Sequence, residues 1–314
     1  MMQYMEKKLK VSVCVVTYNH EKYIRQCLQS IVDQETDFDF EVIVGDDCSK
    51  DGTRQIVESF FIKYPKLIKP VFHEKNIGAA KNYFKVHSLA TGEFIAHMDG
   101  DDYLLPNKLL TQAKFMDKNI ECVLSGHDML FLNEKGSFST NHKFLPEISD
   151  IKSFLQYGNF LAHSSTMYRS IYKLSNTLDQ EPLDFQVHVD RVKSGIVGYI
   201  NKPLGVYRVH DGGMVASYFK STKMFEKNIS AILSVERFLK GEESELVNKA
   251  LYLLGIIWIK NFIVLGETKL AHKVYEHSEF KRLRIFQKIK LKLFITFRHI
   301  VKPIYLIKRG VFKW

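Results

Sequence analysis

Three carboxylates follow an apolar run near residue 100. The run 94–98 is followed by Asp99, Gly100, Asp101 and Asp102. Such a run indicates a buried strand, and the carboxyl end of a strand is where an α/β sheet binds ligands. Two carboxylates separated by one residue repel each other, and a hard divalent cation such as Mg²⁺ or Mn²⁺ relieves the repulsion. The alternative is an acidic Asp-Gly turn, and for Asp102 we expect a solvated turn or a helix cap.

The elements that must position these acids alternate between strands and helices. Apolar, β-branched runs predict strands at residues 10–17, 40–45, 68–73, 94–99 and 121–128. Helices are expected after the first two strands and at residues 78–90 and 106–119. This alternation predicts a parallel sheet with helices on both faces and right-handed crossovers. Three loops with polar or acidic residues then point the same way, after residues 17, 45 and 98.

Four segments in this order resemble the family 2 inverting glycosyltransferases of GT-A fold, of the bacterial surface-polysaccharide type. Residues 11–19 look like the opening strand of the family, and residues 44–53 resemble its VDDGSTDGT segment. Residues 76–82 are similar to its NxGxxxARN stretch, with Lys81 where Arg is usual, and Asp99-Gly100-Asp101 matches its DXD motif. The resemblance implies an α/β fold with a Rossmann-like, mostly parallel sheet, helices on both faces and a helical C-terminal extension.

The resemblance also implies a nucleotide-sugar donor. A UDP-sugar is favoured, because a carboxylate can accept a hydrogen bond from the uracil ring N–H. Lys81 would contact the diphosphate as a point charge. Donor contacts are implied for Thr17, Tyr18, Asn19, Asp46, Asp47, Lys81 and Asp99. The ligands implied for Mn²⁺ or Mg²⁺ are Asp99, Asp101 and His210, the last from a segment at 205–213 that looks like the family's YRVHxGG motif.

Inversion at the anomeric carbon requires a further carboxylate that deprotonates the acceptor hydroxyl. Asp184, followed by the aromatic Phe185, resembles the general base of the family. Asp190 stays open as an alternative, and its other expected fate is a surface pairing with Arg191 or Lys193. His163 lies in a short polar strand that resembles the acceptor-facing segment.

Positive charge is concentrated at the C-terminal end of the 314-residue chain. The chain carries a formal net charge of +10, whereas residues 281–314 contain eleven Lys and Arg and no acid. Apolar residues recur there at steps of three and four: Leu283, Phe286, Ile289, Leu293, Phe297, Ile300 and Ile304. A basic face beside an apolar stripe is typical of a helix in an anionic membrane interface, and the alternative is an ordinary packed helix. Because the charge is confined to this tail, we expect no nucleic-acid partner.

We expect a GT-A catalytic domain at residues 1–217, with a donor half at 1–128 and an acceptor half at 129–217. A helical extension at 218–280 and the basic amphipathic tail at 281–314 follow. Residues 250–259 are expected to form a buried helix, the four cysteines to be reduced thiols, and residues 1–10 contain no apolar signal segment.

The predicted function is metal-dependent transfer of a hexosyl or N-acetylhexosaminyl group to a lipid-linked saccharide acceptor. We expect this reaction to belong to surface polysaccharide synthesis. The predicted location is cytoplasmic, at the inner face of the cell membrane. One alternative is an inactive homologue that binds a donor or partner. A nucleotidyltransferase is disfavoured, because Thr17-Tyr18-Asn19 replaces the Gly-rich loop expected after the first strand.

Overall fold

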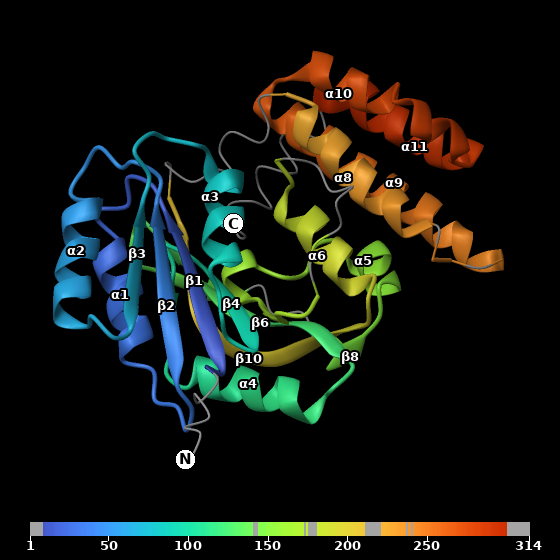
Figure 1. Cartoon of the computed structure of the whole chain (residues 1–314). Coiled ribbons are helices and arrows are strands. Elements are labelled where there is room, and N and C mark those ends of the chain that lie inside the picture. The colour runs from blue at the N-terminus through green and yellow to red at the C-terminus, as the bar shows by residue number, and fades with distance from the viewer. Residues whose placement is uncertain are drawn as a thin grey trace. The chain divides into compact units, whose positions relative to one another are not determined.

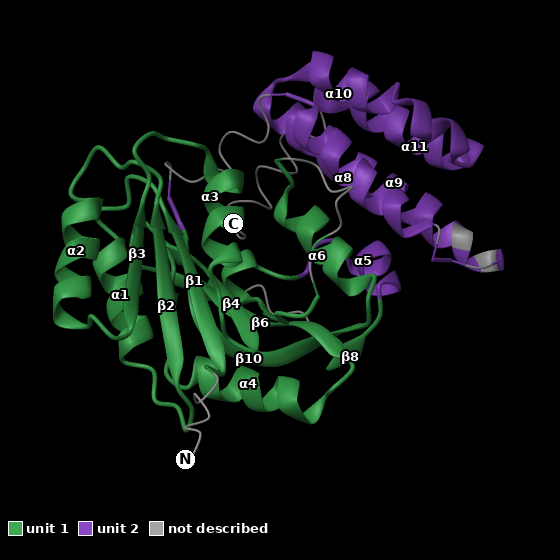
Figure 2. Ribbon diagram, in the orientation of Figure 1, with its two compact units in different colours: residues 1–150, 161–208 green, residues 151–160, 209–314 purple. Residues whose placement is uncertain are grey.

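The chain forms two compact units (Figure 2). The structure is a computed structural model that describes residues 9–140, 144–172, 174, 181–210, 221–236, 238, 239 and 241–299. Unit 1 comprises Met1–Asp150 and Leu161–Arg208, and unit 2 comprises Ile151–Phe160 and Val209–Trp314. The division differs from the three predicted segments, because residues 151–160 join the second unit and the predicted extension and tail share one unit.

Unit 1 is built on a mixed sheet whose strand order is β3-β2-β1-β4-β9-β6-β10-β5 (Figure 1). β7 pairs with β6 and β8 with β10. The strands are β1 (Val11–Thr17), β2 (Phe40–Asp46), β3 (Ile68–Phe72), β4 (Phe94–Asp99), β5 (Tyr103–Leu104), β6 (Cys122–Asn133), β7 (Phe138–Thr140), β8 (Ile148–Ser149), β9 (Met167–Arg169) and β10 (Ile196–Val209). β3, β2, β1 and β4 are parallel, as the alternation of strands and helices predicted.

β9 lies between β4 and β6 and is antiparallel to both. β6 therefore points the same way as β4, although the two do not pair directly. A short strand was expected in this segment, but its insertion into the centre of the sheet was not. The insertion places the 3-10 turn η1 (His163–Ser165), which precedes β9, against the carboxyl end of β4.

Helices cover both faces of the sheet (Figure 1). Those of unit 1 are α1 (Ile24–Val32), α2 (Thr53–Lys63), α3 (Ala79–Ser88), α4 (Lys108–Lys118) and α6 (Asp184–Val192). Apolar residues of α1, α2 and α4 pack in one core with Val13 and Val15 of β1. Side chains alternate along a strand, so Cys14 faces the opposite side, where its Sγ lies 3.8 Å from the Val86 carbonyl of α3.

Unit 2 is helical. Its helices are α5 (Lys152–Tyr157), α8 (Lys223–Glu236), α9 (Ser244–Leu265), α10 (Thr268–Tyr275) and α11 (Ile285–Thr296), with the 3-10 turns η2 (Gly241–Glu243) and η3 (Ser278–Arg282). α9 contacts α5, α8, α10 and α11. Among the described residues, Glu245–Leu265 is the one stretch whose length and mean hydropathy of 1.4 would suit a membrane span, and 56% of its apolar 18-residue window is buried. A central helix of a helical unit has these same properties.

α11 has apolar side chains on two faces. Leu291 and Ile295 are buried, and Gly255 of α9 lies close to Leu291. By contrast, four members of the predicted stripe remain about half exposed, at 57%, 52%, 46% and 51%: Phe286, Ile289, Leu293 and Phe297. Leu283 is buried, and Ile300 and Ile304 lie outside the described residues. The helix is thus packed through residues that the stripe did not include.

Candidate active site

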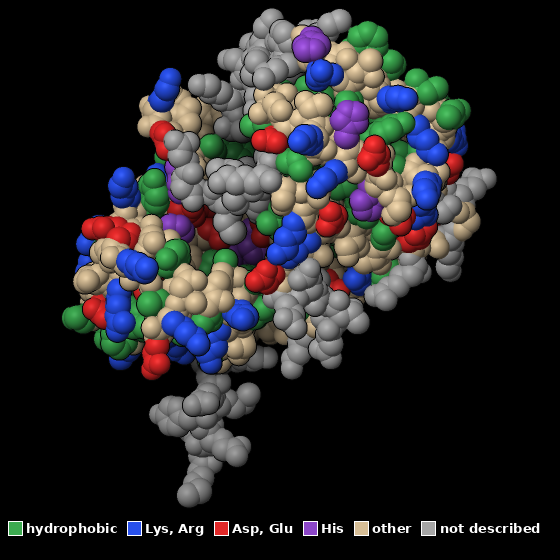
Figure 3. Space-filling view, turned by 90° about the horizontal axis from the view of Figure 1, so that it is seen from above, with side chains coloured by type: hydrophobic (Ala, Val, Ile, Leu, Met, Phe, Trp, Pro, Cys, Tyr) green, Lys and Arg blue, Asp and Glu red, His purple; other side chains and the backbone are tan. Residues whose placement is uncertain are grey.

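The carboxyl ends of β1, β2 and β4 bring three of the predicted loops together. Thr17 is in register with Asp46, and Val16 is in register with Asp99. The Asp47 N–H donates to the Thr17 carbonyl at 3.0 Å, and the Gly100 N–H donates to the Val16 carbonyl at 2.8 Å. Figure 3 looks onto the molecule from above, and acidic and histidine side chains gather in a hollow within this face.

The first two loops are tied together by side chains. Asn19 adopts a left-handed backbone with φ of 55°, and its amide oxygen accepts from the Lys50 N–H at 2.8 Å. The Ser49 hydroxyl accepts from the Asn19 N–H and donates to Asp46. Tyr18 stays 38% exposed, so its ring is available to a flat ligand. Asp46 is buried, and burial raises the pKa of its carboxyl, whereas Ser49 opposes the rise.

Asp47 holds the next predicted segment in place. Its two carboxylate oxygens accept from the Ile77 N–H at 2.7 Å and the Gly78 N–H at 2.9 Å. Gly78 has a φ of 90°, which favours glycine, and α3 begins at the following residue. Lys81 is exposed in the first turn of α3. Asp47 is therefore occupied with backbone N–H groups, which leaves Asp46 as the better candidate to read a base.

The acidic segment after β4 is packed more tightly than its sequence indicated. A Cβ on Gly100 would lie 2.7 Å from Thr17 Oγ1, so only glycine fits between the two acids. Asp99 Oδ1 lies 3.2 Å from His97 Nε2, and Asp101 Oδ2 lies 3.8 Å from His20 Nε2. Burial raises the pKa of the Asp99 carboxyl, and the neighbouring carboxylate of Asp101 adds to the rise.

Asp102 is not the solvated turn or cap residue that we expected. It is 1% exposed, and its oxygens contact the Ser164 hydroxyl at 2.6 Å and accept from the Arg208 N–H at 2.9 Å. Ser164 also accepts from the Asp99 N–H and contacts the Asp99 carboxylate, both at 3.1 Å. The sequence contained no local signal for this bridge, because Ser164 reaches Asp99 only through the insertion of β9.

Asp184 begins α6 and faces η1. Its Oδ1 lies 4.0 Å from His163 Nε2, and its side chain is 39% exposed, so a substrate can reach it. Partial burial raises the pKa of Asp184, His163 opposes this, and Asp99 adds to it. Asp190 is 6% exposed and accepts from Lys193 Nζ at 2.9 Å. The predicted pairing of Asp190 with Lys193 is present, but it is buried and not at the surface.

A cluster of buried rings lies behind these acids. His87 Nε2 is 3.0 Å from His97 Nδ1, and His87 Nδ1 is 2.7 Å from the Tyr168 hydroxyl. The guanidinium of Arg191 lies 3.2 Å from the centroid of the Tyr168 ring and donates to the Tyr83 hydroxyl at 3.2 Å. Sequence reasoning missed this cluster. The available signal was histidine within an apolar strand, at position 97.

Metal ligands are only partly brought together. Within the described ranges, no group of three His, Cys, Asp or Glu side chains converges as a metal cage would. Asp99 and Asp101, 28% and 18% exposed, nonetheless suit a cation that takes its other oxygens from a diphosphate. His210 follows β10, belongs to unit 2 and is partly buried. Residues 211–213 of its predicted motif lie outside the described residues.

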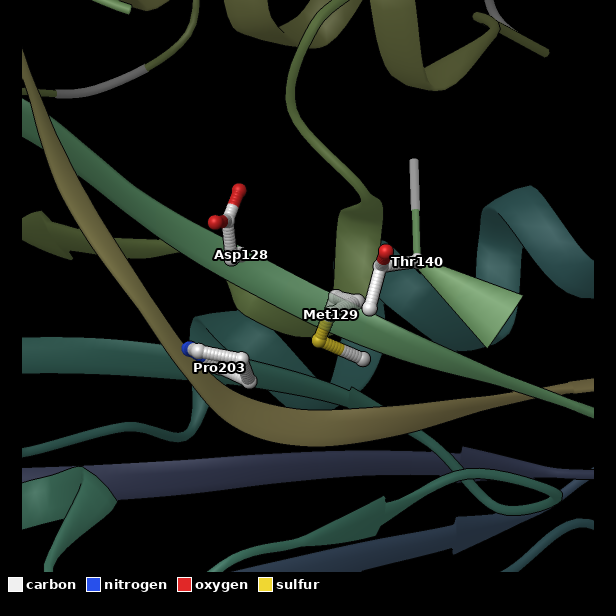
Figure 4. A pocket seen from close by; sticks show the side chains of 4 residues that line it. All are labelled: Asp128, Met129, Thr140 and Pro203. Carbon is white, nitrogen blue, oxygen red and sulfur yellow. The ribbon is translucent and has the colours of Figure 1, made fainter. Parts of the chain in front are cut away.

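A separate pocket of about 250 Å³ opens among β6, β7 and β10 (Figure 4). Asp128, Met129, Thr140 and Pro203 line it. The Tyr199 hydroxyl donates to the Asp128 carboxylate, which is one of the polar contacts of that group. The pocket contains none of the predicted site residues.

The strand order and the acidic segment after β4 define a GT-A type fold. The family model of glycosyl transferase family 2 matches residues 12–174, and the chain belongs to this family.

Two related proteins illustrate the likeness. The uncharacterized protein Rv1520 of Mycobacterium tuberculosis is 31% identical over 218 residues, which are 68% of this chain and 63% of that protein. TarS of Staphylococcus aureus, a poly(ribitol-phosphate) beta-N-acetylglucosaminyltransferase, is 40% identical over 118 residues, 37% of this chain and 20% of TarS. The match to Rv1520 thus spans less than two thirds of that relative's length.

Solved structures show the same fold. The crystal structure of TarS 1–349 in complex with UDP-GlcNAc matches with a TM-score of 0.64 and 21% identity, over 94% of this chain and 88% of that one. The mannosyltransferase PcManGT from Pyrobaculum calidifontis, in complex with GDP-Man and Mn²⁺, matches with a TM-score of 0.56 and 14% identity, over 98% and 88%.

Proposed function

We propose that the protein transfers a sugar, hexosyl or N-acetylhexosaminyl, from a UDP-sugar to a saccharide acceptor with inversion at the anomeric carbon. The observation that carries the proposal is the meeting of two acidic groups at one sheet edge. Asp99, at the end of β4, contacts the Ser164 hydroxyl of η1 at 3.1 Å, and Asp184, at the start of α6, lies 4.0 Å from the adjacent His163 of the same turn. With two acidic groups, one, Asp99, can serve donor binding while the other, Asp184, removes the proton.

Each side chain then has a distinct role. Thr17, Tyr18, Asn19 and Asp46 would hold the nucleoside. Lys81 would meet the diphosphate. Asp184 would take the proton of the acceptor hydroxyl while the oxygen attacks the anomeric carbon and the bond to UDP breaks.

Asp99 and Asp101 would hold Mn²⁺ or Mg²⁺, with His210 as a further ligand. The fit rests on the mutual repulsion of these two carboxylates, which a divalent cation would relieve. When bound, such a cation neutralises the charge of the departing diphosphate. The Mn²⁺ of PcManGT and the UDP-GlcNAc of TarS support these choices by analogy of fold.

We further propose that α11 rests on an anionic membrane surface at the cytoplasmic face, where a lipid-linked acceptor for surface polysaccharide would be found. Its half-exposed stripe, Phe286, Ile289, Leu293 and Phe297, is accompanied by Lys288, Lys290 and Lys292. Residues 281–299 contain no acid. Each basic residue near such a surface contributes about 1 kcal/mol.

The test of the proposed reaction is the variant Asp184→Asn. A panel of UDP-sugars is screened with Mn²⁺ for UDP release, with water as the acceptor, and the fastest donor is used. We expect Asp184→Asn to bind UDP as the parent does, by calorimetry, while UDP release falls by about 10²-fold or more. Asp190→Asn is the matched control on the same helix and should keep the parental rate.

Three results would count against parts of the proposal. Retained activity in Asp184→Asn with loss in Asp190→Asn would transfer the role of base to Asp190. Loss of UDP binding in Asp184→Asn would make Asp184 structural. A parent that binds UDP but releases none from any donor would favour the alternative of an inactive, donor-binding homologue.

A further inference from the structure

The imidazole of His163 is held on three sides. Its Nδ1 lies 3.1 Å from His188 Nε2. The His163 ring centroid lies 3.9 Å from that of His97 and 5.3 Å from that of Tyr83, which is stacked on it at an interplanar angle of 30°. The remaining nitrogen, Nε2, is the one that lies 4.0 Å from Asp184 Oδ1.

α6 presents Asp184 and His188 to the same neighbour. The two residues are four positions apart, so they lie one above the other on one helix face. His163, from η1, lies against both of them. The three side chains contact one another in the order Asp184, His163, His188. His163 can therefore orient Asp184, and His188 can orient His163.

Both histidines are neutral in the working range of an enzyme. Burial lowers the pKa of His163 to about 4; His97 and Arg191 act in the same direction, and the carboxylates of Asp184 and Asp99 oppose it. Burial and the neighbouring His163 and Arg191 lower the pKa of His188 well below its ordinary value. A neutral imidazole carries one N–H, so the hydrogen bond between the two rings admits only two tautomer arrangements.

The carboxylate selects one of these arrangements. If His188 Nε2–H donates to His163 Nδ1, then His163 Nε2–H faces Asp184, which is favourable. The reverse arrangement would point a lone pair at the carboxylate. We propose that His163 is a positioning residue that directs Asp184 and favours its ionised form through this N–H, and that His188 fixes the tautomer. The inference rests on the proposed role of Asp184 as the general base.

The separation of 4.0 Å exceeds a hydrogen bond, and such contacts tighten when substrate binds. Titratable and charged groups face Asp184 and His163 from four elements: Asp99 and His97 from β4, Tyr83 and His87 from α3, His188 and Arg191 from α6, and Tyr207 from β10. The charged carboxylate of Asp99 disfavours the ionised form of Asp184. The N–H of the neutral His163 ring favours the ionised form as a hydrogen-bond donor. Removing the imidazole therefore raises the pKa of the base.

His163→Leu tests the inference by the pH dependence of Mn²⁺-dependent UDP release. We expect kcat to fall by about 10- to 100-fold, as for other residues that orient a ligand or base. The acid limb of the profile should move up by about one pH unit, the equivalent of one hydrogen bond to a charged group. UDP affinity should stay at the parental value. His163→Gln, which keeps an N–H donor, should recover most of the rate and the parental limb.

A double variant separates this inference from the proposed reaction. In Asp184→Asn, the added change His163→Leu should cost nothing further, because the group that it positions is no longer a base. A parental kcat for His163→Leu, or a lower kcat with an unmoved acid limb, would overturn the inference. So would a further loss in the double variant. If Asp184→Asn itself keeps the parental rate, the assignment of the base fails first, and the inference fails with it.

Discussion

Asp47→Ala distinguishes a structural carboxylate from one that reads a base. In the parent, Asp47 is 2% exposed and accepts from the N–H groups of Ile77 and Gly78, the two residues before α3. Alanine leaves both donors without this partner. The turn that leads into α3 loses its anchor, and Lys81 in the first turn of that helix is displaced with it.

The expected magnitude follows from these two contacts. A hydrogen bond to a charged group contributes about 1.5 to 3 kcal/mol, so two such bonds set an upper bound of about 3 to 6 kcal/mol. Ile77 and Gly78 are only partly buried, so water can reach their N–H groups in the variant. We therefore expect the free energy of unfolding to fall by about 2 to 4 kcal/mol.

Urea unfolding measures the stability, and calorimetry with UDP and CDP measures the recognition. CDP is the informative partner because cytosine lacks the ring N–H that uracil donates. Asp47→Ala should weaken binding of both nucleotides by the same factor. Asp46→Asn, the matched change at the adjacent carboxylate, should reduce the preference for UDP over CDP, with a smaller effect on stability. The reasoning is refuted if Asp47→Ala keeps the parental stability while it abolishes the preference for UDP.

Two further predictions concern the metal and the membrane. Asp101→Ala should abolish Mn²⁺-dependent UDP binding in calorimetry, because it removes an oxygen ligand. The control Asp117→Ala, which is remote from the motif, should bind UDP as the parent does. Parental binding by Asp101→Ala would mean that the acidic motif does not hold the metal. A triple variant should sediment at least about 10-fold less with phosphatidylserine vesicles: Phe286→Ser, Ile289→Ser and Leu293→Ser. Each of these side chains contributes about 1.5 kcal/mol or more on burial. Added salt should weaken vesicle binding of the parent. Ile62→Ser, another exposed apolar position, is the control, and equal sedimentation of the triple variant and the parent would exclude the membrane role.

Deleting residues 281–314 would be a poorer test of the same idea. Leu283, Leu291 and Ile295 are buried, so the deletion would remove part of the core of unit 2. The exposed stripe can be changed without touching these residues. The buried residues and the exposed stripe both consist of apolar residues at helical spacing. Only the packing of α11 in the folded protein distinguishes them.

The sequence by itself determined the first half of the fold and the location of the donor loops. Continuous apolar runs of six or seven residues form buried parallel strands, and helices between them require that the carboxyl ends share one edge. The loops containing Thr17, Asp46 and Asp99 are therefore adjacent for a reason that is local and periodic. The helices at residues 79–88 and 108–118 lie within the predicted ranges for the same reason.

Tertiary structure alone decided how the acids are arranged. The three-residue strand β9 enters the sheet beside β4, and this long-range pairing brings Ser164 to Asp99 and Asp102, and His163 to Asp184. The sequence does not distinguish Asp47 from Asp46, yet the two carboxylate oxygens of Asp47 accept hydrogen bonds from the turn before α3. Burial and partner choice depend on residues that are 30 to 65 positions away in the chain, and no local pattern contains that information.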